Sequence, residues 1–159
     1  GALAHSGGAL MAPIQWWKAE FCHRVLNSNV QRRYATICEL DAAGLGGPFD
    51  LVFVGDLLPH TIDPLAALAS AAAQCHGALI IGQAIPDNAG QPPLLSYVGG
   101  AAPQEDRPIW WIPSLPWFQI VLKRLGFSQV KVVDRITHTV RPAGHRVETT
   151  VLHARRGPA

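Results

Sequence analysis

The chain has 159 residues, of which 48% are hydrophobic and 15% are charged, and its formal net charge is +2. This composition predicts one globular domain over residues 1–159 with a buried core, and it excludes an intrinsically disordered chain. The apolar runs are too short to span a bilayer and no signal peptide is recognisable, so we expect a cytoplasmic protein with no membrane partner.

Neither the cysteines nor the histidines have the spacing of a metal site, so the sequence predicts no bound metal. The three cysteines, Cys22, Cys38 and Cys75, are an odd number and show no disulfide pattern. Arginines gather in the last quarter of the chain, at Arg135, Arg141, Arg146, Arg155 and Arg156. They form either a solvated basic edge or a surface that contacts RNA or phosphate, and the sequence leaves both open.

A helix and a strand are expected first. Residues 14–26 form a predicted helix, because Trp17, Phe21 and Val25 follow one another at i, i+4 and i+8 and so lie on one helical face. Residues 33–40 are then expected to form a strand.

The next strand leads to the first candidate site. After a loop over residues 41–48, the apolar run 49–54 is rich in β-favouring residues and predicts a fully buried strand of a parallel sheet. In open α/β sheets, ligands bind at the carboxyl ends of the strands. Gly55, Asp56 and His60 therefore stand where chemistry is expected.

A capped helix and a further buried strand follow this loop. Asp63 is a predicted N-cap and Pro64 a first-turn proline, so the helix should run from residue 64 to residue 75. Gly77 is expected just beyond its end. Residues 78–82, with sequence ALIIG, predict the next buried strand.

The second half of the chain opens with a long segment, residues 83–108, which is rich in proline and glycine. We expect it to form no regular element and to act as a cover over a ligand crevice. A helix capped by Ser114 should run through Leu125, and strands over 130–133 and 148–153 should pair as an antiparallel hairpin. The alternation of strands and helices predicts an α/β fold with a doubly wound, mostly parallel sheet, helices on both faces and an antiparallel C-terminal strand.

Two blocks of sequence resemble a known family. Residues 49–68, FDLVFVGDLLPHTIDPLAAL, resemble the segment around the fourth strand of class I S-adenosylmethionine-dependent methyltransferases, which have a Rossmann-like fold. The stretch Trp110-Trp111-Ile112-Pro113-Ser114, followed by Leu125-Gly126-Phe127, is similar to the group of tRNA wobble-uridine carboxymethyl-modification methyltransferases. The resemblance covers roughly residues 33–82 and 109–134. The first strand of such enzymes, which ends in an acidic residue before a glycine-rich loop, is not found in this sequence, so we expect a domain that lacks it.

The resemblance implies roles for particular residues. Gly7, Gly8, Glu39, Gly55 and Asp56 are the implied S-adenosylmethionine-binding residues, His60 the catalytic residue, and Trp110 and Trp111 the substrate-binding residues. Each has a plainer alternative: His60 as a loop histidine bonded to the backbone, Asp56 as a turn residue, and the tryptophans as packing residues of the core or the cover.

Two functions follow from these observations. The first is methyl transfer from S-adenosylmethionine to a small molecule or a nucleoside, with RNA as a further acceptor. The second is a non-catalytic methyltransferase-like module that binds a partner. If the edge left by the missing first strand is real, pairing with a second copy as a homodimer would cover it.

Overall fold

The computed structural model describes residues 16–86, 92–101, 108–140, 142 and 144–157. The chain divides into two compact units, residues 1–34 and residues 35–159. In the first unit, helix α1 (Trp16–Val25) confirms the first expected helix. The Phe21 and Val25 side chains on its surface are exposed, while the Trp17 side chain lies outside what the structure describes. One domain over the whole chain stays a prediction.

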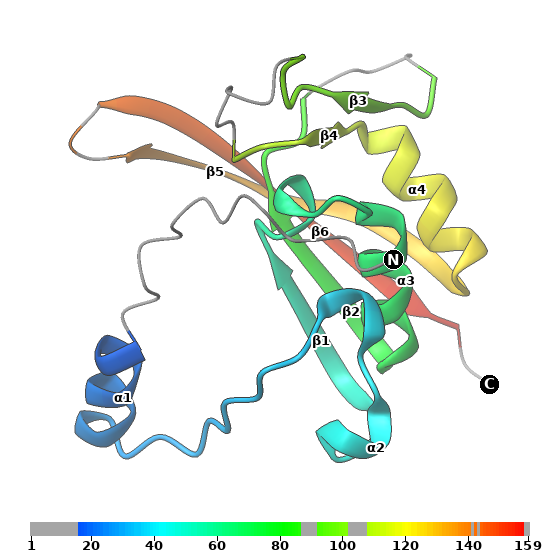
Figure 1. The fold of residues 1–159 in the computed structure, drawn as a ribbon. Coiled ribbons are helices and arrows are strands. Elements are labelled where there is room, and N and C mark those ends of the chain that lie inside the picture. Colours follow the sequence, from blue (N-terminus) through cyan, green and yellow to red (C-terminus); the bar gives the residue numbers. More distant parts are fainter. Residues whose placement is uncertain (1–15, 87–91, 102–107, 141, 143, 158–159) are drawn as a thin grey trace, which may run out of the picture. The chain divides into compact units, whose positions relative to one another are not determined.

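The second unit contains a four-stranded sheet and a two-stranded sheet (Figure 1). Its elements are the 3-10 helix η1 (Ile37–Glu39), α2 (Ala42–Leu45), β1 (Phe49–Gly55), the 3-10 helix η2 (Leu58–His60), α3 (Pro64–Ala73), β2 (Cys75–Gln83), β3 (Leu95–Tyr97), β4 (Trp111–Pro113), α4 (Leu115–Arg124), β5 (Phe127–Val140) and β6 (His145–Arg156). Among the helices of the described ranges, none is long and apolar enough to cross a membrane.

The larger sheet is mixed rather than mostly parallel. Its strand order is β1-β2-β6-β5, with β1 and β2 parallel and the other neighbours antiparallel. The α/β class, the two consecutive parallel strands and the antiparallel C-terminal hairpin are confirmed. The prediction of a mostly parallel sheet is wrong for this sheet, because the β5–β6 hairpin supplies two of its four strands and β6 runs antiparallel to β2.

Helices α3 and α4 cover the same face of this sheet (Figure 1). The fully buried core residues between them and the strands include Leu68 of α3, Phe118 of α4, Leu79 and Ile81 of β2, and Leu152 and Ala154 of β6. Leu79 pairs with Ala154 and Ile81 with Leu152, which places all four on one face. The sequence predicts helices on both faces of the sheet, but α3 and α4 both lie on this one face.

Strand β1 is an edge strand of the sheet, which corrects the prediction that it is fully buried. The Leu51 and Phe53 side chains are 57% and 65% exposed, whereas Val54 is buried in the core. Within the described ranges, no strand pairs with the outer edge of β1. An apolar run predicts a strand, but it does not distinguish a central strand from an edge strand whose second face is uncovered.

The predicted helix caps are confirmed. The Asp63 carboxylate accepts a hydrogen bond from the N–H of Ala66 at 2.9 Å, at the start of α3. The Ser114 hydroxyl accepts one from the N–H of Trp117 at 3.3 Å, at the start of α4. Gly126 follows α4 with a φ of 92°, as expected of a residue that ends a helix.

Three local predictions are wrong. Residues 33–40 contain η1 rather than a strand, because this segment packs against α3 and finds no strand partner. The expected loop 41–48 contains the short helix α2, whose first N–H groups bond to the Asp41 carboxylate. Gly77 does not end α3 but lies inside β2, where an added Cβ would collide with the carbonyl oxygen of Asp50. Glycine is needed there for close strand packing.

The segment 83–108 is more ordered than its composition predicts. Its strand β3 pairs antiparallel with β4, joining residues 95–97 to 111–113. Ser114 strengthens this pairing, because its hydroxyl accepts from the N–H of Leu94 at 2.9 Å and its N–H donates to the carbonyl of Leu94 at 2.9 Å. Residues 87–91 and 102–107 lie outside the described residues, and the role of this segment as a cover stays a prediction.

Arg156, at the end of β6, connects three elements of the unit. Its guanidinium donates hydrogen bonds to the carbonyl oxygens of Cys75 at 2.7 Å, Ala72 at 2.9 Å and Leu125 at 3.0 Å. It also lies over the Phe127 ring, 4.6 Å from the centroid. One arginine thus satisfies carbonyls at the C-terminal ends of α3 and α4, where a positive charge is favoured.

Candidate functional site

The loop after β1 begins with an unusual backbone conformation at Asp56. Its φ is 46°, in the left-handed region that residues other than glycine rarely adopt. The N–H of Asp56 donates to the carbonyl of Gly82 at 2.7 Å, which ties the carboxyl end of β1 to that of β2. The Asp56 side chain is 69% exposed. Gly55 and Asp56 therefore lie at the strand ends, as the sequence predicts.

His60 is held in a defined orientation by its ring nitrogens. Nδ1 lies 2.6 Å from the carbonyl oxygen of Pro108. A carbonyl only accepts, so Nδ1 carries a proton, and in the neutral form of the ring Nε2 then presents a lone pair. Nε2 lies 3.8 Å from Oδ2 of Asp56, and the imidazole is 39% exposed. His60 can take a proton at Nε2, and the Asp56 carboxylate then stabilises the charge.

Aromatic side chains lie against the same loop. The N–H of Trp110 donates to the carbonyl of Pro59 at 2.8 Å. The indole N–H of Trp111 donates to the carbonyl of Ile62 at 3.0 Å. The Tyr97 ring lies 5.2 Å from the Trp111 ring and 6.4 Å from the Trp110 ring.

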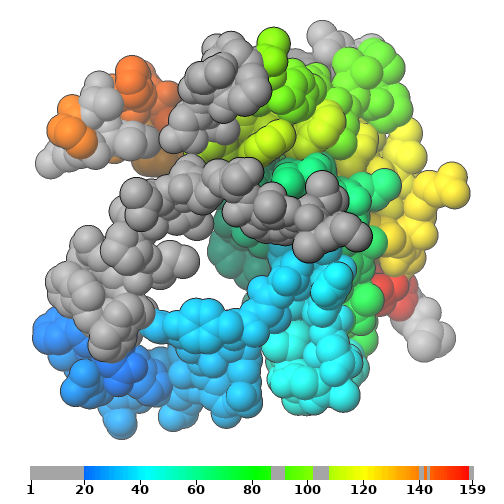
Figure 2. All heavy atoms as spheres, in the orientation of Figure 1, coloured from blue at the N-terminus to red at the C-terminus, as the bar shows by residue number. Residues whose placement is uncertain are grey.

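The two tryptophans differ in what they leave accessible. Trp111 is anchored through its indole N–H and an edge-on contact with Tyr97. Trp110 is 38% exposed, so part of its ring is accessible for stacking. The two-stranded sheet that carries Trp111 lies at the end of the larger sheet where β1 and β2 finish (β3 green and β4 yellow-green in Figure 1). Atoms of these colours lie at the surface in Figure 2.

The structure thus brings together Asp56, His60, Trp110 and Trp111, but it does not place all the predicted cofactor residues with them. Glu39 was expected at the end of a strand; it lies instead in η1 with its side chain exposed. η1 is held by α3, where the Ser70 hydroxyl accepts from the N–H of Leu40 at 3.0 Å. Gly7 and Gly8 lie outside the described residues.

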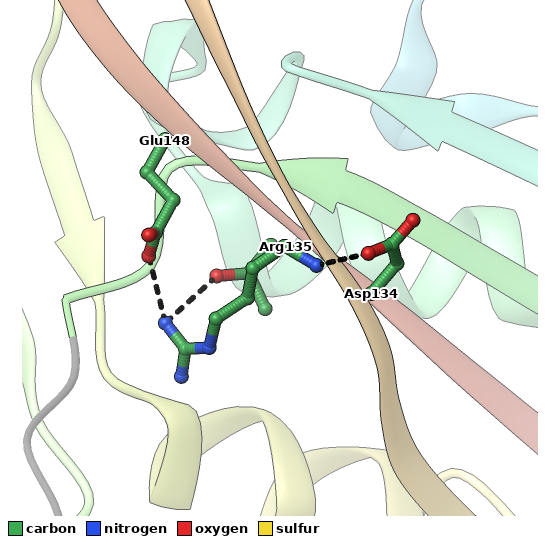
Figure 3. Close-up of polar contacts among 4 residues, drawn as sticks. Asp134, Arg135 and Glu148 are labelled. Atoms are coloured by element: carbon green, nitrogen blue, oxygen red, sulfur yellow. Dashed lines mark hydrogen bonds and ion pairs between the residues drawn. The ribbon is translucent and has the colours of Figure 1, made fainter.

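Sequence reasoning missed a polar row at the same end of the sheet. Gln83, at the end of β2, pairs with Thr150 of β6, which pairs with Arg135 of β5. Arg135 Nη1 donates to Glu148 Oε1 at 2.9 Å and to Thr150 Oγ1 at 3.4 Å, and its backbone N–H donates to Asp134 (Figure 3).

The side-chain amide of Gln83 is the unsatisfied member of this row. Gln83 is fully buried, and neither Nε2 nor Oε1 has a hydrogen-bond partner in the described structure. Leaving such a group unpaired costs about 1–3 kcal/mol. The sequence does contain a signal for this residue. Side chains of a strand alternate between its two faces, so Gln83, directly after the apolar run 78–82, falls on the same inward face as Leu79 and Ile81.

Two substitutions of Asp56 are expected to show how much its left-handed backbone conformation costs in stability, because both remove the carboxylate. We expect Asp56→Gly to be more stable than Asp56→Ala by about 1 kcal/mol, because glycine adopts left-handed φ without a Cβ clash. Urea denaturation of the two variants measures the difference. Equal stabilities would show that the turn relaxes and stores no strain.

No protein-family model matches this sequence, and no curated protein sequence matches it either. Solved structures do match its fold. The N-terminal domain of EvdMO1 with SAH bound superposes with a TM-score of 0.62 at 24% identity, covering 89% of this chain and 60% of that one. An O-methyltransferase family protein from Burkholderia thailandensis gives a TM-score of 0.54 at 16% identity, covering 89% of this chain and 40% of that one.

A third structure is the magnesium protoporphyrin IX methyltransferase ChlM from Synechocystis with SAH bound. It gives a TM-score of 0.52 at 20% identity, covering 87% of this chain and 57% of that one. This chain therefore spans about 60% of the EvdMO1 domain and less of the other two. The finer resemblance to the tRNA wobble-uridine group is not shown by these structures and stays a prediction. The chain has a methyltransferase-like α/β fold.

Proposed function

We propose that this chain transfers a methyl group from S-adenosylmethionine to a hydroxyl group of a small-molecule or nucleoside acceptor. The observation that carries the proposal is the arrangement of His60. Its Nδ1–H is fixed on the carbonyl of Pro108, and its Nε2 faces Asp56 at the carboxyl end of β1. A histidine in this state suits proton removal from an acceptor hydroxyl. The methyltransferase-like fold supports the same conclusion.

The residues at the end of β1 fit a cationic methyl donor. The carboxylate of Asp56 is 69% exposed, and its Oδ2 lies 3.8 Å from Nε2 of His60. It is therefore accessible to an ammonium group, from which it can accept hydrogen bonds. When bound, S-adenosylmethionine supplies the electrophilic methyl group and a thioether leaving group.

The chain's own residues then supply position and proton transfer. Trp110 offers a partly exposed ring on which a planar acceptor stacks. His60 takes the hydroxyl proton at Nε2, while Asp56 stabilises the imidazolium. The carbonyl of Pro108 keeps the ring oriented throughout. These groups also suit a nucleoside within RNA, which is the further acceptor we propose.

Calorimetry with the full chain tests the donor site. We expect SAH to bind with a micromolar Kd, and Asp56→Asn to weaken binding at least tenfold, because a charge-assisted hydrogen bond contributes about 1.5–3 kcal/mol. The matched control is Asp50→Asn. Asp50 lies near the amino end of β1 and pairs with His76 at 2.8 Å, so its loss should leave the Kd unchanged. Equal weakening by both variants would contradict the site.

A second candidate is a non-catalytic module that binds a partner or a second copy of the chain. It is favoured by one observation: Leu51 and Phe53 of β1 are exposed beside an edge that is unpaired in the described ranges. If the wild-type chain binds no SAH, the methyl-transfer proposal fails. Concentration-dependent association measured by light scattering would then support this second function.

A further inference from the structure

A basic cavity lies on the face of the sheet opposite α3 and α4. Leu152 and Ala154 of β6 point into the core, so the alternating residues His153 and Arg155 point to the other face. The strand register places Lys131 beside His153 and Gln129 beside Arg155. Four polar side chains from two neighbouring strands therefore share one small area.

These side chains line an open cavity of about 350 Å³, together with Val133. This volume is at the lower end of the range for small-molecule sites. The walls are rigid, because β5 and β6 are paired along their length and Val130 and Leu152 pack behind them in the core. Paired strands fix the backbone positions of these residues, so binding here does not pay the entropy cost of ordering a loop.

The charges in this cavity are uncompensated. In the described part of the chain, the side chains of Lys131 and Arg155 make no hydrogen bond and no ion pair. Arg135, on the opposite face of the same strand, is paired with Glu148 at 2.9 Å. Two positive charges, an imidazole and an amide thus line the cavity, and among the described residues no carboxylate does. This lining favours an anionic ligand over a cationic one.

We propose that this cavity binds the phosphate group of a ligand. The Arg155 guanidinium matches two phosphate oxygens with its planar fork, and Lys131 supplies a second, compact charge. A phosphate monoester carries close to two negative charges, which the two cations neutralise, whereas a carboxylate would leave one cation unpaired. The amide of Gln129 and the ring of His153 provide further donors. The phosphate belongs either to a small molecule or to a nucleic-acid strand.

The test uses the full chain and two probes, inorganic pyrophosphate and a single-stranded RNA ten-mer, titrated by calorimetry at low salt. We expect saturable binding of pyrophosphate with a submillimolar Kd. The double variant Lys131→Gln/Arg155→Gln should weaken it at least tenfold. The matched control Lys123→Gln/Arg124→Gln removes two exposed charges from α4, on the other face, and should change the Kd less than twofold.

The two probes distinguish the source of the phosphate. RNA binding that is lost only in the Lys131/Arg155 variant assigns the cavity to nucleic acid, and pyrophosphate binding alone assigns it to a small phosphorylated ligand. Circular dichroism checks that each variant is folded. Equal loss in the two double variants, or no saturable binding of either probe, would overturn the proposal. Because neither probe involves S-adenosylmethionine, the result is independent of the methyl-transfer proposal.

Discussion

Replacing Arg156 with alanine is expected to lower the free energy of unfolding by about 3–5 kcal/mol. The substitution leaves the carbonyl oxygens of Cys75, Ala72 and Leu125 without their charged donor. It also removes the cation that stacks on Phe127. Each hydrogen bond to a charged group contributes about 1.5 kcal/mol or more, and water that takes the place of the guanidinium offsets part of the loss. Urea denaturation followed by tryptophan fluorescence measures the change.

Two further variants make this expectation sharper. Arg156→Lys keeps the charge but has one nitrogen in place of the three that bond here, so we expect an intermediate loss. Arg155→Ala is the matched control, because its side chain points to the other face, and its effect should stay within about 0.5 kcal/mol. A small effect of Arg156→Ala, comparable with that of Arg155→Ala, would show that the three bonds contribute little.

The second large effect is expected at His60. Under the proposed function, His60→Ala should lower the rate of methyl transfer by about 10²–10⁴-fold, the usual contribution of a general base. The affinity for SAH should change little, because Asp56 remains. The measurement is the initial rate of transfer from labelled S-adenosylmethionine to a hydroxyl acceptor that supports turnover, alongside calorimetry with SAH.

The matched control for His60 is His76→Ala. His76 is also an exposed histidine paired with an aspartate, Asp50, but it lies at the start of β2, at the opposite end of the sheet from the loop that carries His60. Its loss should leave the transfer rate unchanged. If His60→Ala and His76→Ala have the same rate as the wild type, then His60 is a loop histidine that only bonds to the backbone, which is the plainer reading of its position.

The parts of the fold that the sequence predicts are those set by local chemistry. Asp63 and Ser114 cap helices through bonds to residues three positions away, and such bonds can be inferred from neighbours alone. The apolar runs 49–54 and 78–82 form strands, as their local composition predicts. The positions of Asp56 and His60 could also be predicted from the sequence, since both residues closely follow one of these strands.

The parts that escaped prediction depend on distant partners. Residues 33–40 have strand-like composition, but α3 rather than a strand lies beside them, so they form η1. β3 exists because it pairs with β4 across a long loop, which no local pattern shows. Gln83 and Arg135 share a row only through β6, which lies between their strands. Register between distant strands is not readable from either strand alone.

The order of strands in the larger sheet determines how the chain reaches this fold. β1, α3 and β2 are consecutive in the chain, and so are α4, β5 and β6, so each group assembles from near neighbours. The groups meet where β2 pairs with β6, for example at Ile80 and His153. Pairing β2 with β6 closes the whole stretch of chain between them into a loop, which costs more chain entropy than closing a hairpin turn. We therefore expect this pairing to form last, and until then the open edge of β2 is where two nascent chains would mispair.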